Sequence, residues 1–207
     1  MLKNILYAIL LGVGMAACLA DRDSAENEQT TLTDTTGTAI TAVETAGTPS
    51  PDPSAFVIGS NKVGSVQIGM PIEEIRQHVP QGYTITDTTL RMEGQDYTAY
   101  VLHAGNGGKG LLVEQQCEPE CKVWRLRVRD ADYKTAQGIG IGSKYGEVQK
   151  SFPISYVGPG EGNFVAVSEK TGMTFVLNVS QLPKDRLSKL KPADVPANTI
   201  VESIFIF

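Results

Sequence analysis

One short pattern occurs twice in this chain, and it constrains the fold more than any other feature. The segment 66–80, VQIGMPIEEIRQHVP, aligns without a gap on the end of the segment 138–153, GIGIGSKYGEVQKSFP. The identical positions are Ile68 with Ile141, Gly69 with Gly142, Glu74 with Glu147, and Pro80 with Pro153. The alignment predicts that the folded part of the chain is a duplicated unit.

Each copy has the residues of a short strand, a glycine turn and a short helix. In the first copy, Pro71 stands where a helix can begin without losing an internal hydrogen bond, and Pro80 ends it. Strand-like runs follow at 83–91, 97–103, 111–116 and 122–129, and again at 154–157, 163–168, 173–179 and 199–207. We therefore predict an α+β fold of two tandem repeats, about 56–136 and 137–207, each a short strand and short helix followed by an antiparallel strand meander.

Residues 1–18 have the features of an export signal that ends in a lipid-acceptor cysteine. Lys3 supplies a positive charge, residues 5–13 are apolar, and small or slim residues precede Cys18, with Met15 in place of the commoner Leu. The apolar run is shorter than the roughly 20 residues that a membrane-spanning helix needs. We predict a lipoprotein signal peptide and acylation of Cys18 with diacylglyceryl and palmitate chains; the alternative is an ordinary secretory signal with a coincidental cysteine.

Residues 19–55 contain few side chains that could bury apolar area. The stretch is rich in Thr from 30 to 48 and ends in Pro49-Ser-Pro-Asp-Pro53. Ordering it would cost conformational entropy with little return, so we predict a disordered tether that holds the domain 56–207 away from the membrane. Leu19 lacks the Asp that retains some bacterial lipoproteins in the inner membrane, which favours the outer membrane. Whether the domain lies on the periplasmic or the surface face stays open.

Charge and cysteine content narrow the class of protein further. The 207 residues carry a net charge of −5, whereas nucleic-acid binders usually present a basic patch, so we predict no nucleic-acid partner. Cys117 and Cys121 flank a tight loop, and in an exported protein they predict a disulfide; free thiols and a metal site are the alternatives. A zinc site needs about four ligands, and the chain adds only two histidines on other segments, so we predict no metal.

Glycine-rich segments do not predict a cofactor site. Gly108-Lys109 is followed by Gly110 instead of the Ser or Thr of a phosphate-binding loop. Gly138, Gly140 and Gly142 alternate, whereas a dinucleotide-binding turn has the spacing G-x-G-x-x-G. We predict structural turns and no cofactor.

The segment 122–129 predicts a strand with one apolar and one basic face. Alternation places Trp124, Leu126 and Val128 on the face that packs in the core. The opposite face then carries three arginines, Arg125, Arg127 and Arg129. Guanidinium groups pair with carboxylates and phosphates, so these arginines are a candidate surface for an acidic partner or lipid headgroups. The alternative is a solvated sheet face on which neighbouring acids pair with them.

No pattern in the chain assembles a catalytic site. His78 and His103 fall at the ends of predicted elements, where surface histidines are common, and no serine lies in a G-x-S-x-G turn. Glu73, Glu74 and Glu147 lie on predicted helices beside basic residues, which suits a solvated face. We assign no catalytic residue and expect that the protein is not an enzyme.

The chain resembles a known family over residues 64–207. The segments 123–132, VWRLRVRDAD, and 138–148, GIGIGSKYGEV, with the terminal 201–205, VESIF, resemble the envelope-stress (sigma-E, RpoE) regulated lipoprotein family of unknown function. The resemblance implies an envelope lipoprotein and transfers no catalytic residue. The plan of a helix and a strand meander, twice over, is also similar to the tandem repeats of beta-lactamase inhibitor protein and to the small lipoprotein of the outer-membrane assembly machine, which bears on fold alone.

These observations predict a membrane-anchored envelope lipoprotein that binds an envelope protein or helps to maintain the envelope, without chemistry. The alternative is a small cell-envelope hydrolase that uses carboxylates brought together by the fold.

Overall fold

The structure is a computed structural model, and it describes residues 52–105 and 108–207. The predicted signal peptide, Cys18 and the tether up to residue 51 lie outside the described residues. Within the described ranges, no helix is long and apolar enough to cross a membrane.

The described residues form twelve strands, two α-helices and four short 3-10 helices. The strands are β1 (Val57–Gly59), β2 (Lys62–Val63), β3 (Val66–Gln67), β4 (Tyr83–Met92), β5 (Gln95–Ala104), β6 (Leu111–Cys117), β7 (Cys121–Val128), β8 (Lys134–Thr135), β9 (Tyr156–Gly160), β10 (Asn163–Ser168), β11 (Met173–Leu177) and β12 (Val201–Ile206). The helices are α1 (Ile72–Gln77) and α2 (Tyr145–Ser151), with 3-10 turns η1 (Pro53–Phe56), η2 (Glu169–Thr171), η3 (Leu187–Lys189) and η4 (Pro192–Asp194).

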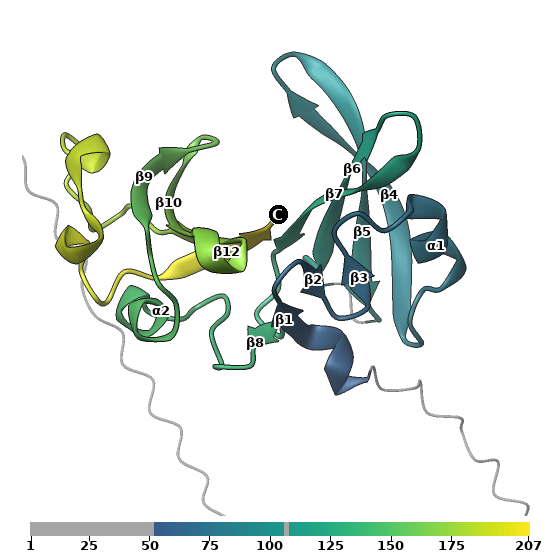
Figure 1. Cartoon of the computed structure of the whole chain (residues 1–207), viewed down its shortest axis with the longest axis horizontal. Coiled ribbons are helices and arrows are strands. Elements are labelled where there is room, and N and C mark those ends of the chain that lie inside the picture. Colours follow the sequence, from purple (N-terminus) through teal and green to yellow (C-terminus); the bar gives the residue numbers. More distant parts are fainter. Residues whose placement is uncertain (1–51, 106–107) are drawn as a thin grey trace, which may run out of the picture. The chain divides into compact units, whose positions relative to one another are not determined.

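Eight strands form one antiparallel sheet in the order β4-β5-β6-β7-β12-β11-β10-β9. The last strand, β12, therefore lies in the middle of the sheet, where Ile204 is opposite Val128 and Ile206 is opposite Leu126 of β7 (Figure 1). Both faces of β12 are apolar, as expected of a central strand. Four short strands form a second sheet, β3-β2-β1-β8, in which β1 and β8 are parallel.

The main core lies against one face of the eight-stranded sheet. Ile72 and Ile75 of α1 and Tyr145 and Val148 of α2 belong to the same buried cluster as Leu126 of β7. We call the opposite face of the sheet, which the helices do not cover, the open face. It carries two smaller apolar clusters, one of Ala99, Val101 and Leu112 and one of Val165, Val176 and Phe205.

The predicted α+β class built of two tandem repeats is wrong, because the structure is mostly β. The helix α1 has six residues and α2 has seven, so each makes fewer than about two turns. Helices this short cannot form a layer of their own and persist only where their few apolar side chains pack on a sheet. The strands, by contrast, reach ten residues in β4 and β5 and contribute most of the buried cluster.

Two glycine turns fix the starts of the helices against the centre of the large sheet. The Gly69 N–H donates to the Val123 carbonyl at 2.8 Å, and the Gly142 N–H donates to the Val201 carbonyl at 2.9 Å. Both glycines have a positive φ, 83° at Gly69 and 85° at Gly142, and residues other than glycine rarely adopt this backbone conformation. Each of these glycine turns thus fixes the start of a helix against the large sheet.

Candidate functional site

The open face contains two adjoining hollows of about 320 Å³ and about 620 Å³. We call them together the sheet groove. It is lined by Leu90, Met92, Tyr97, Glu114, Gln116, Trp124, Arg125, Arg127, Glu161 and Phe205, among others. These residues come from β4, β5, β6, β7, β12 and the turn between β9 and β10, so strands distant in sequence build the groove together.

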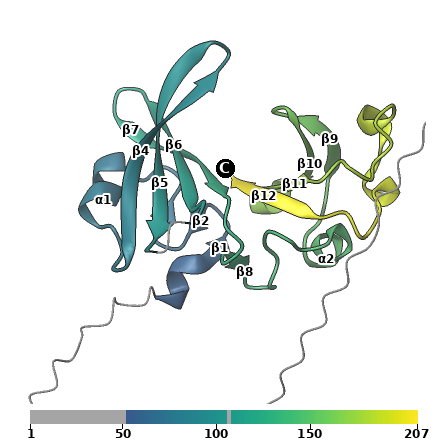
Figure 2. The ribbon, with the colours of Figure 1, turned by 180° about the vertical axis from the view of Figure 1, so that it is seen from behind.

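The smaller hollow opens because two hairpins separate. Pairing between β5 and β6 stops at Ala99 and Glu114, while β4 and β5 stay paired to the tip of their hairpin at Met92 and Gln95. Beyond Glu114, β6 pairs only with β7, and its register with β7 shifts at this point. The tip of the β4–β5 hairpin extends past the sheet in both views (Figures 1 and 2). Its side chains form one wall of the groove.

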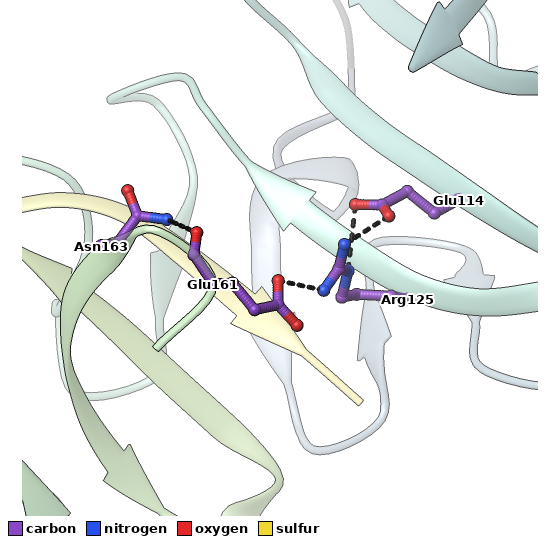
Figure 3. Close-up of polar contacts among 4 residues, drawn as sticks. All are labelled: Glu114, Arg125, Glu161 and Asn163. Atoms are coloured by element: carbon purple, nitrogen blue, oxygen red, sulfur yellow. Dashed lines mark hydrogen bonds and ion pairs between the residues drawn. The ribbon is translucent and has the colours of Figure 1, made fainter. Parts of the chain in front are cut away.

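A buried arginine lies at the centre of the groove. The Arg125 Nε donates to Glu114 Oε1 at 3.0 Å and its Nη2 donates to Glu114 Oε2 at 2.5 Å, a bidentate pair (Figure 3). Its third nitrogen, Nη1, donates to the carboxylate of Glu161, and Asn163 holds the Glu161 carbonyl at 2.8 Å. Arg125 and Glu114 are each 4% exposed, so this pair is removed from water and fixed in place.

Aromatic rings surround the same guanidinium. The Arg125 Cζ lies 4.6 Å from the centre of the Trp124 ring and 4.9 Å from that of Phe205. Phe207 lies edge-on to Trp124, with 6.5 Å between ring centres. In such cation–π contacts the guanidinium is attracted to the faces of the rings. The groove therefore presents rigid aromatic surfaces around a neutralised charge.

The placement of Trp124 differs from the sequence prediction. Strict alternation put Trp124 on the core face with Leu126, but the register pairs Glu114 with Arg125 and Gln115 with Val123, which leaves Trp124 as the extra residue of a β-bulge. A bulge shifts the alternation by one position. Trp124 consequently lies on the open face beside Arg125 and is 40% exposed.

The three arginines of the predicted surface have different surroundings. Arg125 is neutralised by two glutamates within the chain. Arg127 is half-buried over the Phe205 ring at 4.8 Å. Arg129 is half-buried and donates from Nη2 to the Lys109 carbonyl at 2.8 Å. Burial, and secondarily the charge of Arg127, lowers the pKa of the Arg129 guanidinium.

The disulfide predicted between Cys117 and Cys121 is present and closes the turn between β6 and β7. Each of the two histidines forms a hydrogen bond with a backbone carbonyl group. His103 Nδ1 lies 2.8 Å from the Gly108 carbonyl oxygen and His78 Nδ1 lies 3.0 Å from that of Glu74. In the ranges 52–105 and 108–207, no group of three or more His, Cys, Asp or Glu side chains is placed to hold a metal ion.

Several residues of the groove were not found from the sequence. Leu90, Met92 and Tyr97 lie in strand patterns typical of any solvated hairpin, and only the end of pairing at Ala99 brings them together. Glu114 did carry a signal, since a charged residue next to the buried run 111–113 needs a partner inside the fold. The last strand also carried a signal. Apolar residues at the successive positions Ile204, Phe205 and Ile206 indicate that side chains on both faces of this strand are buried.

Comparison with known proteins places the fold among solved structures. The chain is similar to the uncharacterized protein YfeY from Escherichia coli, with a TM-score of 0.53 and 13% sequence identity over 72% of this chain and 97% of that chain. At this identity the similarity concerns the fold alone. No family model and no curated protein matches the sequence.

Proposed function

We propose that this chain is a lipid-anchored envelope protein that binds another protein in the sheet groove and catalyses no reaction. The observation that carries the proposal is the composition of the groove. Trp124 and Tyr97 are each 40% exposed there beside arginines, and Trp, Tyr and Arg are the residues that dominate binding energy at protein interfaces.

The rigidity of the groove supports a binding role. Arg125 is held by two glutamates and packs against Trp124 and Phe205, so these side chains have little conformational freedom to lose. Ordering a side chain on binding costs about 0.5–1.5 kcal/mol, and a groove that is already ordered avoids that cost. A partner can therefore gain affinity from the aromatic surfaces directly.

The same contacts support a role without catalysis. Glu114 and Glu161, the acids at the centre of the groove, both accept hydrogen bonds from Arg125. General acid and base catalysis needs a carboxyl group that exchanges protons with the substrate, and an arginine-bound carboxylate is poorly suited to that task. The alternative of a cell-envelope hydrolase therefore has no specific observation in its favour.

The support for the lipid anchor and for the outer-membrane localisation comes from the sequence. The charged start, the short apolar run and Cys18 support a lipoprotein in the outer membrane, with a periplasmic or surface-exposed domain. The resemblance to the envelope-stress regulated lipoprotein family supports the same address. Replacing Cys18 with Ala should abolish labelling by radioactive palmitate and release the protein from membranes; membrane association and labelling that persist would contradict the anchor.

Photo-crosslinking in intact cells tests the binding role. Benzoylphenylalanine in place of Trp124 or Tyr97 should capture one reproducible envelope protein. The matched control carries it in place of Lys150, an exposed residue of α2. Capture of the same protein from Lys150 with equal yield, or no reproducible product from either groove position, would refute a partner in the groove.

A further inference from the structure

Arg127 and Arg129 are two half-buried positive charges near the end of β7. Arg127 lines the larger hollow of the open face, and Arg129 follows directly after the strand, close enough for the charge of Arg127 to act on it. Across 52–105 and 108–207, no Asp or Glu oxygen lies within 4.0 Å of either guanidinium. We call these two residues the arginine pair.

The neighbouring Arg125 is a buried arginine whose charge is neutralised by carboxylates of the same chain. It receives two carboxylates, one of them bidentate, from β6 and from the β9–β10 turn. The arginine pair receives none from the described residues, although both of its members are half-buried. The Nε atoms of Arg127 and Arg129 are both buried and have no hydrogen-bond partner there.

The surroundings raise the electrostatic cost of leaving the pair unmatched. Arg127 is opposite Leu112 on one side and Phe205 on the other, so it lies between the two apolar clusters of the open face. Charges interact more strongly in such partly dewatered surroundings than in bulk water. Burial and the neighbouring charge of Arg127 both lower the pKa of Arg129, in the direction expected of like charges without a counterion.

Resting on the proposed function, we infer that the arginine pair binds the carboxylate of an Asp or Glu side chain of the protein that occupies the sheet groove. A guanidinium donates two parallel hydrogen bonds to a carboxylate, and Arg127 is already fixed over Phe205 in a position to do so. The Nη groups of Arg127 are the donors available to such a carboxylate, because Arg127 lines the larger hollow and only its Nε is fully buried.

The charge distribution favours an acidic protein side chain over a membrane or a nucleic acid. Lipid headgroups are usually recognised by clusters of about 4–8 basic residues, and nucleic acids by basic patches that track the phosphates. The arginines that line the larger hollow are Arg91, which pairs with Asp96, Arg125, which pairs with two glutamates, and Arg127, which has no carboxylate partner among the described residues. Exposed aromatic residues lie beside them, and the chain carries a net charge of −5. This arrangement matches a single acidic side chain with apolar neighbours.

A peptide titration tests the inference with the full lipidated chain in detergent. The probe is a fluorescein-labelled peptide of alternating Glu and Leu, and its control has Gln in place of every Glu. Fluorescence anisotropy should show binding of the acidic probe and at least about tenfold weaker binding of the Gln probe, as expected when charge-assisted hydrogen bonds are lost. Equal binding of the two probes would overturn the inference.

Two double variants assign the effect to the arginine pair. R127Q/R129Q should weaken binding of the acidic probe at least about tenfold, and K150Q/R186Q, with the same change in net charge at exposed positions, should not. The thermal midpoint should change little in R127Q/R129Q, because the variant removes two unmatched charges as well as the Arg129 hydrogen bond to the Lys109 carbonyl and the Arg127 contact with Phe205. A lower midpoint with unchanged probe binding would assign the pair to packing and overturn the inference.

Other occupants give distinct outcomes that also overturn it. One is tighter binding of phosphatidylglycerol vesicles than of the peptide, lost in R127Q/R129Q. Another is a gain in peptide affinity when the acids of residues 21–28 are replaced by amides, which would assign the site to the chain's own segment. If crosslinking from Trp124 still captures an envelope protein while the acidic probe does not bind, the inference fails and the proposed function stands.

Discussion

Replacing Arg125 with Met should destabilise the fold strongly. Met fills much of the same volume, so the main loss is the guanidinium and its three hydrogen bonds to carboxylates. The Glu114 carboxylate, 4% exposed, would then lie in the sheet without a partner. Breaking a buried ion pair by removing one member costs about 3–5 kcal/mol, which is a large share of the stability of a domain this size.

Replacing Glu161 with Gln should cost much less. Its side chain is 52% exposed, so the amide can keep one hydrogen bond to Arg125 and water can solvate the remainder. Exposed ion pairs contribute about 0–1 kcal/mol. The two carboxylates that bind one guanidinium should therefore contribute very different free energies of unfolding. The difference follows from burial, since the Glu114 side chain is buried and the Glu161 side chain is 52% exposed.

Urea unfolding, followed by the fluorescence of Trp124, measures both variants. The double variant R125M/E114L should recover most of the loss, because replacing both members of a buried pair with apolar residues is often close to neutral. If R125M does not fold, recovery of folding by the double variant gives the same answer. A loss below about 1 kcal/mol for R125M, or a double variant less stable than either single one, would refute the buried-pair reasoning.

Three further predictions concern the turns and one buried phenol. Replacing Cys117 and Cys121 with Ser should cost about 2 kcal/mol in the free energy of unfolding, since the ring is short; a thermal midpoint that does not change would contradict this. Gly110→Ala should destabilise more than Gly94→Ala by urea titration, because both have positive φ but only at Gly110 would a Cβ lie 2.3 Å from the Leu102 carbonyl oxygen. Burial raises the pKa of Tyr145 from 10.0 to about 12. The free energy of unfolding should therefore stay constant up to about pH 10 and fall toward pH 12, because only the phenol of the unfolded chain ionises in this range. In Tyr145→Phe, urea titrations at a series of pH values should show a smaller decline. A decline equal to that of the unsubstituted protein would exclude Tyr145 as its source.

The strands and the disulfide could be predicted from local pattern. The runs at 83–91, 111–116 and 122–129 overlap β4, β6 and β7, because alternating or continuous apolar residues report which face is buried. The fold class could not be predicted correctly, since Ile72 and Ile75 have helical spacing over a segment too short to count as a layer. Helix length depends on tertiary packing that the spacing alone does not contain.

The groove was predicted only in part, and the reason is long-range pairing. The row of arginines was visible in alternation, but the bulge at Trp124 depends on the register between β6 and β7. The neutralisation of Arg125 depends on Glu161, 36 residues away, which reaches it only because β12 joins the two halves of the sheet. Such contacts come from the order of strands, which a single sequence does not specify.

Site-specific photo-crosslinking is the most direct test of a protein partner in the sheet groove. With benzoylphenylalanine at Trp124, at Tyr97 or, as a control, at Lys150, mass spectrometry should identify one envelope protein from the two groove positions and little of it from α2. Products spread equally over the three positions, or absent from Trp124 and Tyr97 while the protein is folded and anchored, would contradict the account.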